Sequence, residues 1–310
     1  MKYLNFSIFT HFIVLILLVT VSLNQALSAG LKEHEHSSNV THQSSAAAVA
    51  RQLSNPVSLL WSLNLQNNWT FNKGDLSDGD YEDFYKFEFQ PVVPLLLTEN
   101  LKLITRMSLP ILGGKPAFNP AKMDFDNKSG LGDIALFSLF SPNKKPTKSH
   151  PYEILLGAGP TFIFPTASKD SLGQGKWQAG PTGLLGYLDK KWVIAALVQQ
   201  WWSYGGDSDR SKTSQMAIQY FVWRNLPGAW QVGTGGPTIN INWEASDNDD
   251  KVNLPLGLGI TKTFKLGKLP MKIQLAGTYS VVHEDTFGER WNIQLTLTPV
   301  IPSLIKGAIF

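Results

Sequence analysis

Six charged side chains occupy positions from which they would project into one shared interior. Lys86 and Glu88 are two residues apart, and the others lie at the polar positions of further alternating segments; the set is Lys86, Glu88, Lys102, Arg106, Glu153 and Lys272. Residues i and i+2 of a β-strand point to the same side. Opposed charges on the inner wall of a pore select solutes. Alternatively, they pair across strands and fill the interior, and the sequence leaves both interpretations open.

Two further clusters carry atoms that bind metal ions. One is the acidic stretch SDNDDK, residues 246–251, which lacks the full spacing of a calcium loop and is interpreted as a solvated acidic loop. The other consists of three imidazoles in an N-terminal tail, at His34, His36 and His42. Imidazoles at this spacing bind zinc, copper or nickel, although a plain polar tail has the same composition. The sequence predicts no metal site and no cofactor.

Nucleophilic catalysis has weak support. Cysteine is absent from the 310 residues, which excludes a thiolate nucleophile, a disulfide framework, a Cys-based metal site and a lipid anchor on cysteine. His283 lies three residues after Ser280 and directly before Glu284, but neighbours this close in a strand point in different directions. No G-x-S-x-G or zinc-protease motif occurs. We therefore predict that the chain is not an enzyme, and its scattered basic residues predict no nucleic-acid binding.

The elements that must position these side chains are β-strands. In WSLNLQNNWTF, residues 61–71, the odd positions other than Asn67 are large and apolar, and every even position is small or polar. The same period of two recurs along the chain and gives a count of twelve strands. The other eleven are 85–93, 101–111, 131–140, 152–163, 177–187, 192–204, 214–223, 230–243, 252–264, 271–282 and 291–301.

The connections between these segments alternate in length and charge. Seventeen of the 24 acidic residues fall in the longer set, whereas the short set holds eight basic residues and two acidic ones. Strands that run up and down across a barrier place every second connection on the same side, which explains this sorting. The longer set is 72–83, 112–130, 164–176, 204–214, 244–251 and 282–290; the short set is 97–100, 141–151, 188–191, 224–229 and 265–270.

The lengths of the strands and the residues at their ends indicate a bilayer. A tilted strand crosses the hydrocarbon core in about 9 to 11 residues, the length of 61–71 and of 291–301. Tryptophans that lie near strand ends, such as Trp61, Trp192 and Trp230, are typical of the membrane interface. Because lipid cannot hydrogen-bond exposed backbone, such strands must close on themselves. We predict an all-β fold, a transmembrane antiparallel up-and-down β-barrel of about 12 strands; a soluble barrel or sandwich is the alternative.

The sequence divides into three parts. Residues 1–29 read as a cleaved signal peptide, because Lys2 precedes an apolar run, 12–21, that is too short to span a membrane. Residues 30–54 read as a polar, histidine-containing tail that ends in an alanine-rich stretch, where a short helix is expected. Residues 55–310 are predicted to form the barrel.

Prolines gather around the connection 164–176, at Pro160, Pro165 and Pro181. One interpretation is a loop that folds inward, or a lateral gap in the wall where proline weakens strand pairing. The other is a set of bulges that curve the barrel, which we favour.

Eight short motifs resemble the bacterial outer-membrane family named for the meta-pathway of phenol degradation, whose members are often labelled as transporters. The motifs are NPVSLLWSLNLQNNWTF (55–71), LITRMSLPI (103–111), GLGDI (130–134), GAGPTFIFPTA (157–167), LGQGKWQAGP (172–181), NLPGAW (225–230), NWEA (242–245) and LPLGLGITKTF (254–264). The resemblance covers residues 55–301 and implies a Gram-negative outer-membrane protein that takes up small hydrophobic compounds. The tail at 31–44 and the ending PSLIKGAIF depart from the family pattern.

The function predicted from these observations is an outer-membrane channel for passive passage of small, hydrophobic or aromatic molecules. A twelve-stranded barrel is wider than side chains alone can fill, so some lumen should remain. The expected partners are outer-membrane lipid, lipopolysaccharide, the solute and the barrel-assembly machinery. The alternatives are a structural or binding barrel that is plugged by 112–130 or by 45–56, and a lipid hydrolase built into the barrel wall.

Overall fold

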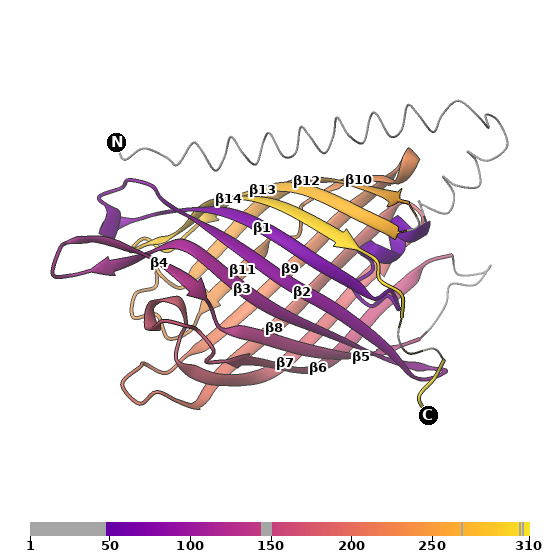
Figure 1. The fold of residues 1–310 in the computed structure, drawn as a ribbon, viewed down its shortest axis with the longest axis horizontal. Helices are drawn as coiled ribbons and strands as arrows, with labels where there is room; N and C mark the ends of the chain where they lie inside the picture. The colour runs from indigo at the N-terminus through magenta and orange to yellow at the C-terminus, as the bar shows by residue number, and fades with distance from the viewer. Residues whose placement is uncertain (1–47, 144–150, 268, 304, 306) are drawn as a thin grey trace. The chain divides into compact units, whose positions relative to one another are not determined.

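The computed structural model describes residues 48–143, 151–267, 269–303, 305 and 307–310. Its strands form one antiparallel sheet that closes on itself (Figure 1). The wall strands are β1 (Ser62–Lys73), β2 (Glu82–Thr98), β3 (Leu101–Asn119), β5 (Ile134–Pro142), β6 (Glu153–Phe164), β7 (Lys176–Leu188), β8 (Trp192–Gly206), β9 (Ser214–Leu226), β10 (Trp230–Gly233) with β11 (Thr238–Asn242), β12 (Val252–Leu266), β13 (Leu269–Val282) and β14 (Gly288–Pro299).

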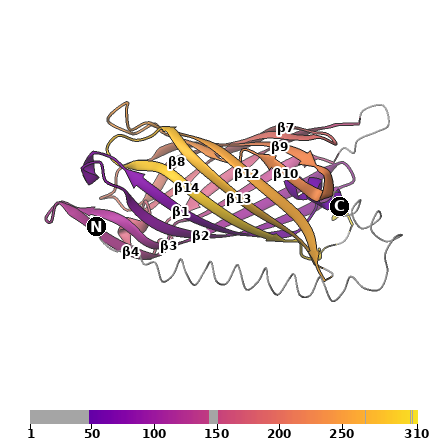
Figure 2. The same ribbon diagram turned by 90° about the horizontal axis from the view of Figure 1, so that it is seen from above.

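The predicted fold class is confirmed. β10 and β11 are two parts of one wall strand, and β4 (Asp124–Leu131) lies outside the ring, so the wall has twelve strands. β1 pairs with β14 along the register Leu65↔Leu297 to Phe71↔Trp291, which closes the barrel. The strands cross the barrel at a tilt, as the view turned by 90° also shows (Figure 2). Closure leaves no free strand edge, which a bilayer requires.

The alternation in the sequence separates the two faces of the wall. Outward side chains such as Leu258, Leu185 and Leu256 are 71%, 64% and 55% exposed. Inward positions on the same strands are mostly polar and covered, for example Gln178 on β7 and Thr261 on β12, which are fully buried. An apolar outer face and a polar inner face are the arrangement of a barrel that stands in lipid around a polar lumen.

The structure interrupts one predicted strand and excludes one of the two alternative plugs. The segment 230–243 is divided into β10 and β11, because residues 234–237 do not pair with β12, although Thr234 and Pro237 still hydrogen-bond to β9. Gly235 and Gly236 adopt φ of +82° there, a conformation that favours glycine, and Pro237 has no N–H to donate to a neighbour. The connection 112–130 is not a plug, since β3 and β4 extend it outward as a hairpin with Phe118 opposite Phe125 (Figure 1).

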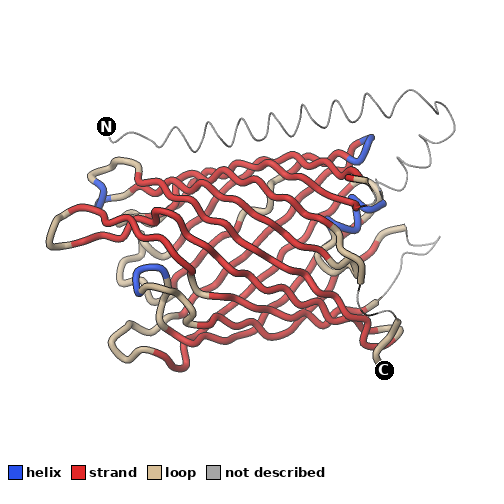
Figure 3. Tube along the Cα trace, viewed as in Figure 1, coloured by secondary structure: helices blue, strands red, loops and turns tan. Residues whose placement is uncertain are grey.

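Both described ends of the chain lie at the end of the barrel that carries the short turns (Figure 3). Residues 48–54 are helical and lead into β1. At the other terminus, the backbone N–H groups of Ile309 and Phe310 donate to the carbonyls of Leu96 and Leu97 at the end of β2. No helix among the described residues is long and apolar enough to cross a membrane.

Candidate functional site

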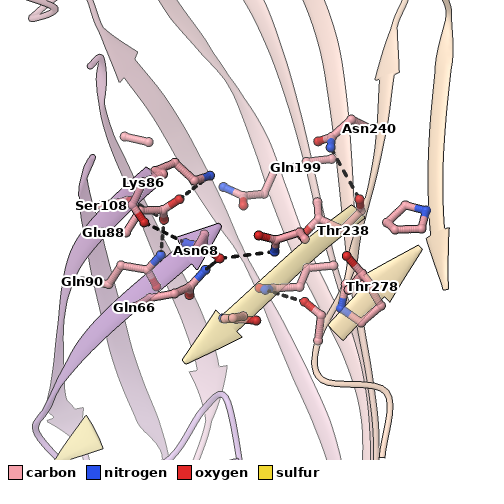
Figure 4. A pocket seen from close by; sticks show the side chains of 18 of the residues that line it. Gln66, Asn68, Lys86, Glu88, Gln90, Ser108, Gln199, Thr238, Asn240 and Thr278 are labelled. Atoms are coloured by element: carbon pink, nitrogen blue, oxygen red, sulfur yellow. Dashed lines mark hydrogen bonds and ion pairs between the residues drawn. The ribbon is translucent and has the colours of Figure 1, made fainter. Parts of the chain in front are cut away.

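A polar cavity of about 300 Å³ lies inside the barrel. Its lining comes from all the wall strands except β6 and β7, so the cavity belongs to the lumen rather than to one face. Figure 4 shows part of this lining. Most of its hydrogen-bonding groups are carboxamides, which both donate and accept. They belong to Gln66, Asn68, Gln90, Gln199, Gln219, Asn240, Asn292 and Gln294. Trp201 and Phe137 add aromatic surface to the same cavity.

Two of the six predicted charges neutralise each other at one side of this cavity. Lys86 Nζ lies 2.6 Å from Glu88 Oε1 on the same strand. The second carboxylate oxygen of Glu88 accepts hydrogen bonds from Gln90 and, at 3.1 Å, from Ser108 on β3 (Figure 4). Glu88 is therefore fully partnered, which corresponds to the pairing interpretation for these two residues.

Arg106 reaches across the lumen. Its guanidinium donates to Gln219 Oε1 at 3.3 Å, and Gln219 Nε2 donates to the Gly236 carbonyl at 3.2 Å. Arg106 is on β3 and Gln219 on β9, and four wall strands separate them along the shorter arc of the barrel. The guanidinium also lies over the Phe137 ring, 4.7 Å from its centroid. This bridge narrows the lumen at the level of the cavity, and no carboxylate among the described residues lies within ion-pair distance of Arg106.

The break in the wall at 234–237 contributes to the same constriction. Gln274, an inward residue of β13, donates to the Gly235 carbonyl at 2.9 Å, so the broken segment is displaced toward the lumen. Pairing between this wall strand and β12 stops after Gly233↔Gly259 and resumes at Asn240↔Asn253. Gly236, Pro237 and Pro255 from this interrupted region line the cavity.

The other three predicted charges lie near the short-turn end of the lumen. Lys102 Nζ is 3.9 Å from Glu153 Oε1, and both side chains are largely covered. Lys272 Nζ donates to the Leu53 carbonyl at 3.3 Å, at the last turn of the helical residues 48–54. A cation at this position complements the negative end of the helix dipole. The six charges therefore fall into two groups instead of one ring.

Residues 48–57, called the N-terminal segment below, occupy this end of the lumen. Ser54 Oγ donates to Gln231 Oε1 at 2.7 Å, and Gln231 is fully buried. Val57 is 1% exposed and belongs to an apolar cluster of inward side chains. The other members are Ile104, Phe137, Leu139, Leu155, Leu184, Ala195 and Leu197. The segment is thus held at this end of the lumen by both polar and apolar contacts.

The sequence reasoning missed several residues of the site. Glu289 lines the cavity, whereas the sequence pattern places it in the connection 282–290, because a bulge at the start of β14 shifts the alternation there. The carboxamides occupy polar positions of the alternating segments, but the six predicted lumen residues are all charged and do not include them. Nothing in the local sequence indicates that Gln219 meets Arg106, since 113 residues separate them.

The remaining candidate sites are not assembled. Ser280 Oγ donates to Asn253 Oδ1 at 3.2 Å, whereas His283 Nδ1 pairs with the Glu284 carbonyl, so the two have different partners. In the acidic stretch, Asp250 accepts from the backbone and hydroxyl of Thr286. Within the described ranges no group of three or more acidic, histidine or cysteine side chains could hold a metal ion. His34, His36 and His42 lie outside those ranges.

The prolines near 164–176 sit in a paired region of the wall. Pro160 lies opposite Pro181 in a register of β6 and β7 that runs from Glu153↔Leu188 to Ile163↔Gln178. The connection itself folds over residues 130–133, where Asp133 accepts from the backbone N–H groups of Ala167 and Gln174. Pairing between β6 and β7 is therefore unbroken, but each strand skips two pairs on its other side at the proline: β5–β6 between Phe137↔Thr161 and Phe140↔Ala158, and β7–β8 between Ala179↔Trp202 and Thr182↔Gln199. A longer interruption lies beside β12.

Comparison with known proteins supports the fold. No family model matches the chain, and no curated protein matches it by sequence. Among solved structures, the COG4313 outer membrane channel from Pseudomonas putida F1 is similar, with a TM-score of 0.56, 15% identity, and coverage of 80% of this chain and 98% of that one. Outer membrane phospholipase A from Escherichia coli matches at a TM-score of 0.38, 10% identity, and coverage of 82% and 99%. A Pseudomonas aeruginosa FadL homologue matches at 0.35, 8% identity, and 79% and 91%. The first of these shows that the chain has the fold of an outer-membrane barrel.

Proposed function

We propose that this protein is an outer-membrane channel for passive passage of small molecules, with a constriction at Arg106. The observation that carries the proposal is the bridge from Arg106 through Gln219 to Gly236, which crosses a polar lumen inside an apolar wall. The guanidinium has no described carboxylate within ion-pair distance and places a positive charge at the bridge itself, while Lys86, Glu88 and Glu289 bring the formal charge of the whole lining to zero. Charged groups at a constriction select solutes.

The lining favours solutes that combine an aromatic or apolar body with a polar or acidic group. Trp201, Phe137 and Pro237 offer flat apolar surface, while the carboxamides and Arg106 offer hydrogen bonds. This chemistry is compatible with the resemblance to the phenol meta-pathway family, and membership of that family is part of the proposal. The interrupted pairing beside β12 borders the cavity, which supports a second exit for apolar solutes through the wall.

The first experiment measures conductance and liposome swelling with the refolded chain and with Arg106→Gln. We expect the variant to lose preference for anionic over neutral solutes and to gain conductance, because the bridge is cut. Lys169→Gln, which removes an exposed charge from a long loop, is the matched control and should behave as the parent. A folded barrel whose flux is the same in all three proteins would reject Arg106 as the constriction.

The second candidate function is a plugged structural barrel, and the N-terminal segment favours it. The absence of cysteine allows a direct test with Ser54→Cys/Gln231→Cys joined through a short reducible linker that forms a disulfide with each thiol, since Ser54 Oγ lies 2.7 Å from Gln231 Oε1. If the segment is a removable plug, the protein should show no conductance while the disulfides are formed and should conduct after reduction. Asn64→Cys/Thr298→Cys joins two adjacent wall strands and serves as the control crosslink. No flux in either redox state of the locked variant would support the plugged barrel.

Location and processing are part of the same proposal. The sorting of loops supports insertion with the short turns in the periplasm, lipopolysaccharide around the long acidic loops, and delivery by the barrel-assembly machinery. Residues 1–29 would be removed during export, leaving the tail 30–54 and the barrel 55–310, and N-terminal sequencing of the mature protein tests this directly.

We also propose that the chain is not an enzyme, since Ser280 and His283 have separate partners; phospholipase activity in the purified protein would contradict this.

A further inference from the structure

Two cation–π pairs lie on the outer wall near the short-turn end of the barrel. The Arg224 guanidinium is 5.1 Å from the centroid of the Trp192 ring, and Lys262 Nζ is 4.8 Å from that of Trp230. Each pair joins directly opposed residues, Trp192↔Arg224 between β8 and β9 and Trp230↔Lys262 between β10 and β12. Since β10 lies between β9 and β12, the two pairs are neighbours.

All four side chains belong to the outer face. The residue next to each along its strand is buried and points inward, as Val193, Trp223, Gln231 and Thr261 do. The surrounding outward residues are apolar and exposed, including Ile194, Leu226, Ile260 and Leu275 at 38% to 52%. The pairs therefore lie at the edge of the lipid-facing surface, where tryptophan marks the headgroup level of a bilayer.

The positive charge of this region is uncompensated. The sequence holds no acidic residue from 211 to 243 or from 251 to 283, and the adjacent turns add Lys190, Lys191 and Lys265. The one nearby acid, Asp189, accepts hydrogen bonds from the backbone N–H groups of Lys191 and Trp192. Among the described ion pairs, none includes Arg224 or Lys262.

Both cations keep donors free. Lys262 Nζ donates one hydrogen bond, to the Gly228 carbonyl at 2.6 Å, and an ammonium has three donors. Stacking on a ring uses the face of the Arg224 guanidinium and leaves N–H groups at its edge, which suit bidentate contact with a phosphate. Each tryptophan holds its cation against the wall, so less side-chain entropy is lost on binding.

We infer that Arg224 and Lys262, held by Trp192 and Trp230, form a site for the phosphate of an anionic glycerophospholipid on the outer wall. The inference rests on the proposed function, in which the short turns face the periplasm and this surface meets the inner leaflet. The lipid tails lie along Ile194, Ile260 and Leu275, while the headgroup meets the two cations. The site would anchor the barrel at a fixed depth.

The test compares lipid retention by native mass spectrometry after the full mature chain is extracted from nanodiscs of phosphatidylglycerol and phosphatidylcholine. Arg224→Gln/Lys262→Gln should bind phosphatidylglycerol about 25-fold less tightly, since each cation near a bilayer surface contributes about a fivefold factor. Lys169→Gln/Lys212→Gln removes the same two charges from the long loops and should retain the preference of the parent.

Two outcomes of this comparison would overturn the inference: equal retention of phosphatidylglycerol by all three proteins, or an equal loss of phosphatidylglycerol in both double variants. In a competition between purified lipid A and phosphatidylglycerol, preferential retention of lipid A by the parent would also overturn it. Conductance of the same preparations separates this site from the channel. A parent protein that retains phosphatidylglycerol through Arg224 and Lys262 but conducts nothing would support the lipid site and reject the channel. Failure of the parent to enter the nanodisc would reject both.

Discussion

Val57 is the residue whose truncation most directly tests how the N-terminal segment is held. Its side chain is 1% exposed and packs in the apolar cluster with Ile104, Leu139 and Leu155. Val57→Ala removes two methyl groups from this cluster. At about 0.8 kcal/mol for each buried carbon, with a further contribution from the cavity left behind, docking should weaken by about 2 kcal/mol. At 1.4 kcal/mol for each factor of ten, the undocked population rises roughly thirtyfold.

The assay uses a single introduced thiol in a chain that has none. Ala50→Cys places a cysteine at a helical position that is 3% exposed, so a bulky maleimide reaches it when the segment leaves the lumen. At low reagent concentration the labelling rate is proportional to the undocked fraction. The Val57→Ala form of this protein should therefore label about thirtyfold faster, and its conductance should rise.

Leu185→Ala is the matched control, because it truncates a residue on the outer wall that is 64% exposed. Its labelling rate should equal that of the parent. A rate within threefold of the parent for Val57→Ala would refute the reasoning, since it would mean that the apolar cluster does not determine whether the segment stays docked.

Two further predictions concern the break in the wall and one loop. Gly235→Ala should destabilise the barrel by about 1–3 kcal/mol in urea titrations, because φ is +82° and the new Cβ would lie 2.6 Å from Ala276 Cβ; Gly277→Ala, with no neighbour within 4 Å, should be neutral. Burial, with the charge of Asp250 adding to it, raises the pKa of Glu284 to about 7 from an ordinary value of 4.5. The folded loop then binds the proton more tightly than the unfolded chain, so this stabilisation is complete below pH 4.5 and is lost as pH rises through 7. Hydrogen exchange in residues 283–287 should be slower at pH 5 than at pH 8 after correction for intrinsic rates, and Glu284→Gln should abolish the difference; a difference that persists in the variant would assign it to another group.

Local patterns in the sequence were sufficient for the architecture. Period-two alternation, as in residues 61–71, determines which side chains can face lipid, and a barrel is the way to satisfy every strand edge in lipid. The inward positions of Lys86, Glu88 and Arg106 follow from the same alternation. The break at 234–237 was present as two glycines and a proline, but the apolar residues on either side of it favoured one continuous strand.

The tertiary structure alone decided which of these side chains meet. Strand alternation states which face a residue occupies, but not its height or its partner across the lumen, which depend on the stagger of twelve strands around a closed ring. The hydrogen bond from Arg106 to Gln219 depends on this stagger, as does the one from Lys272 to the Leu53 carbonyl at the end of the helical residues 48–54. Docking of Val57 likewise depends on the apolar cluster, which forms only when the barrel closes, since its members come from strands that are distant in sequence. The face of the wall that a side chain occupies is a local property of the strand and can be predicted from the sequence. Contacts across the lumen are non-local and require the closed barrel.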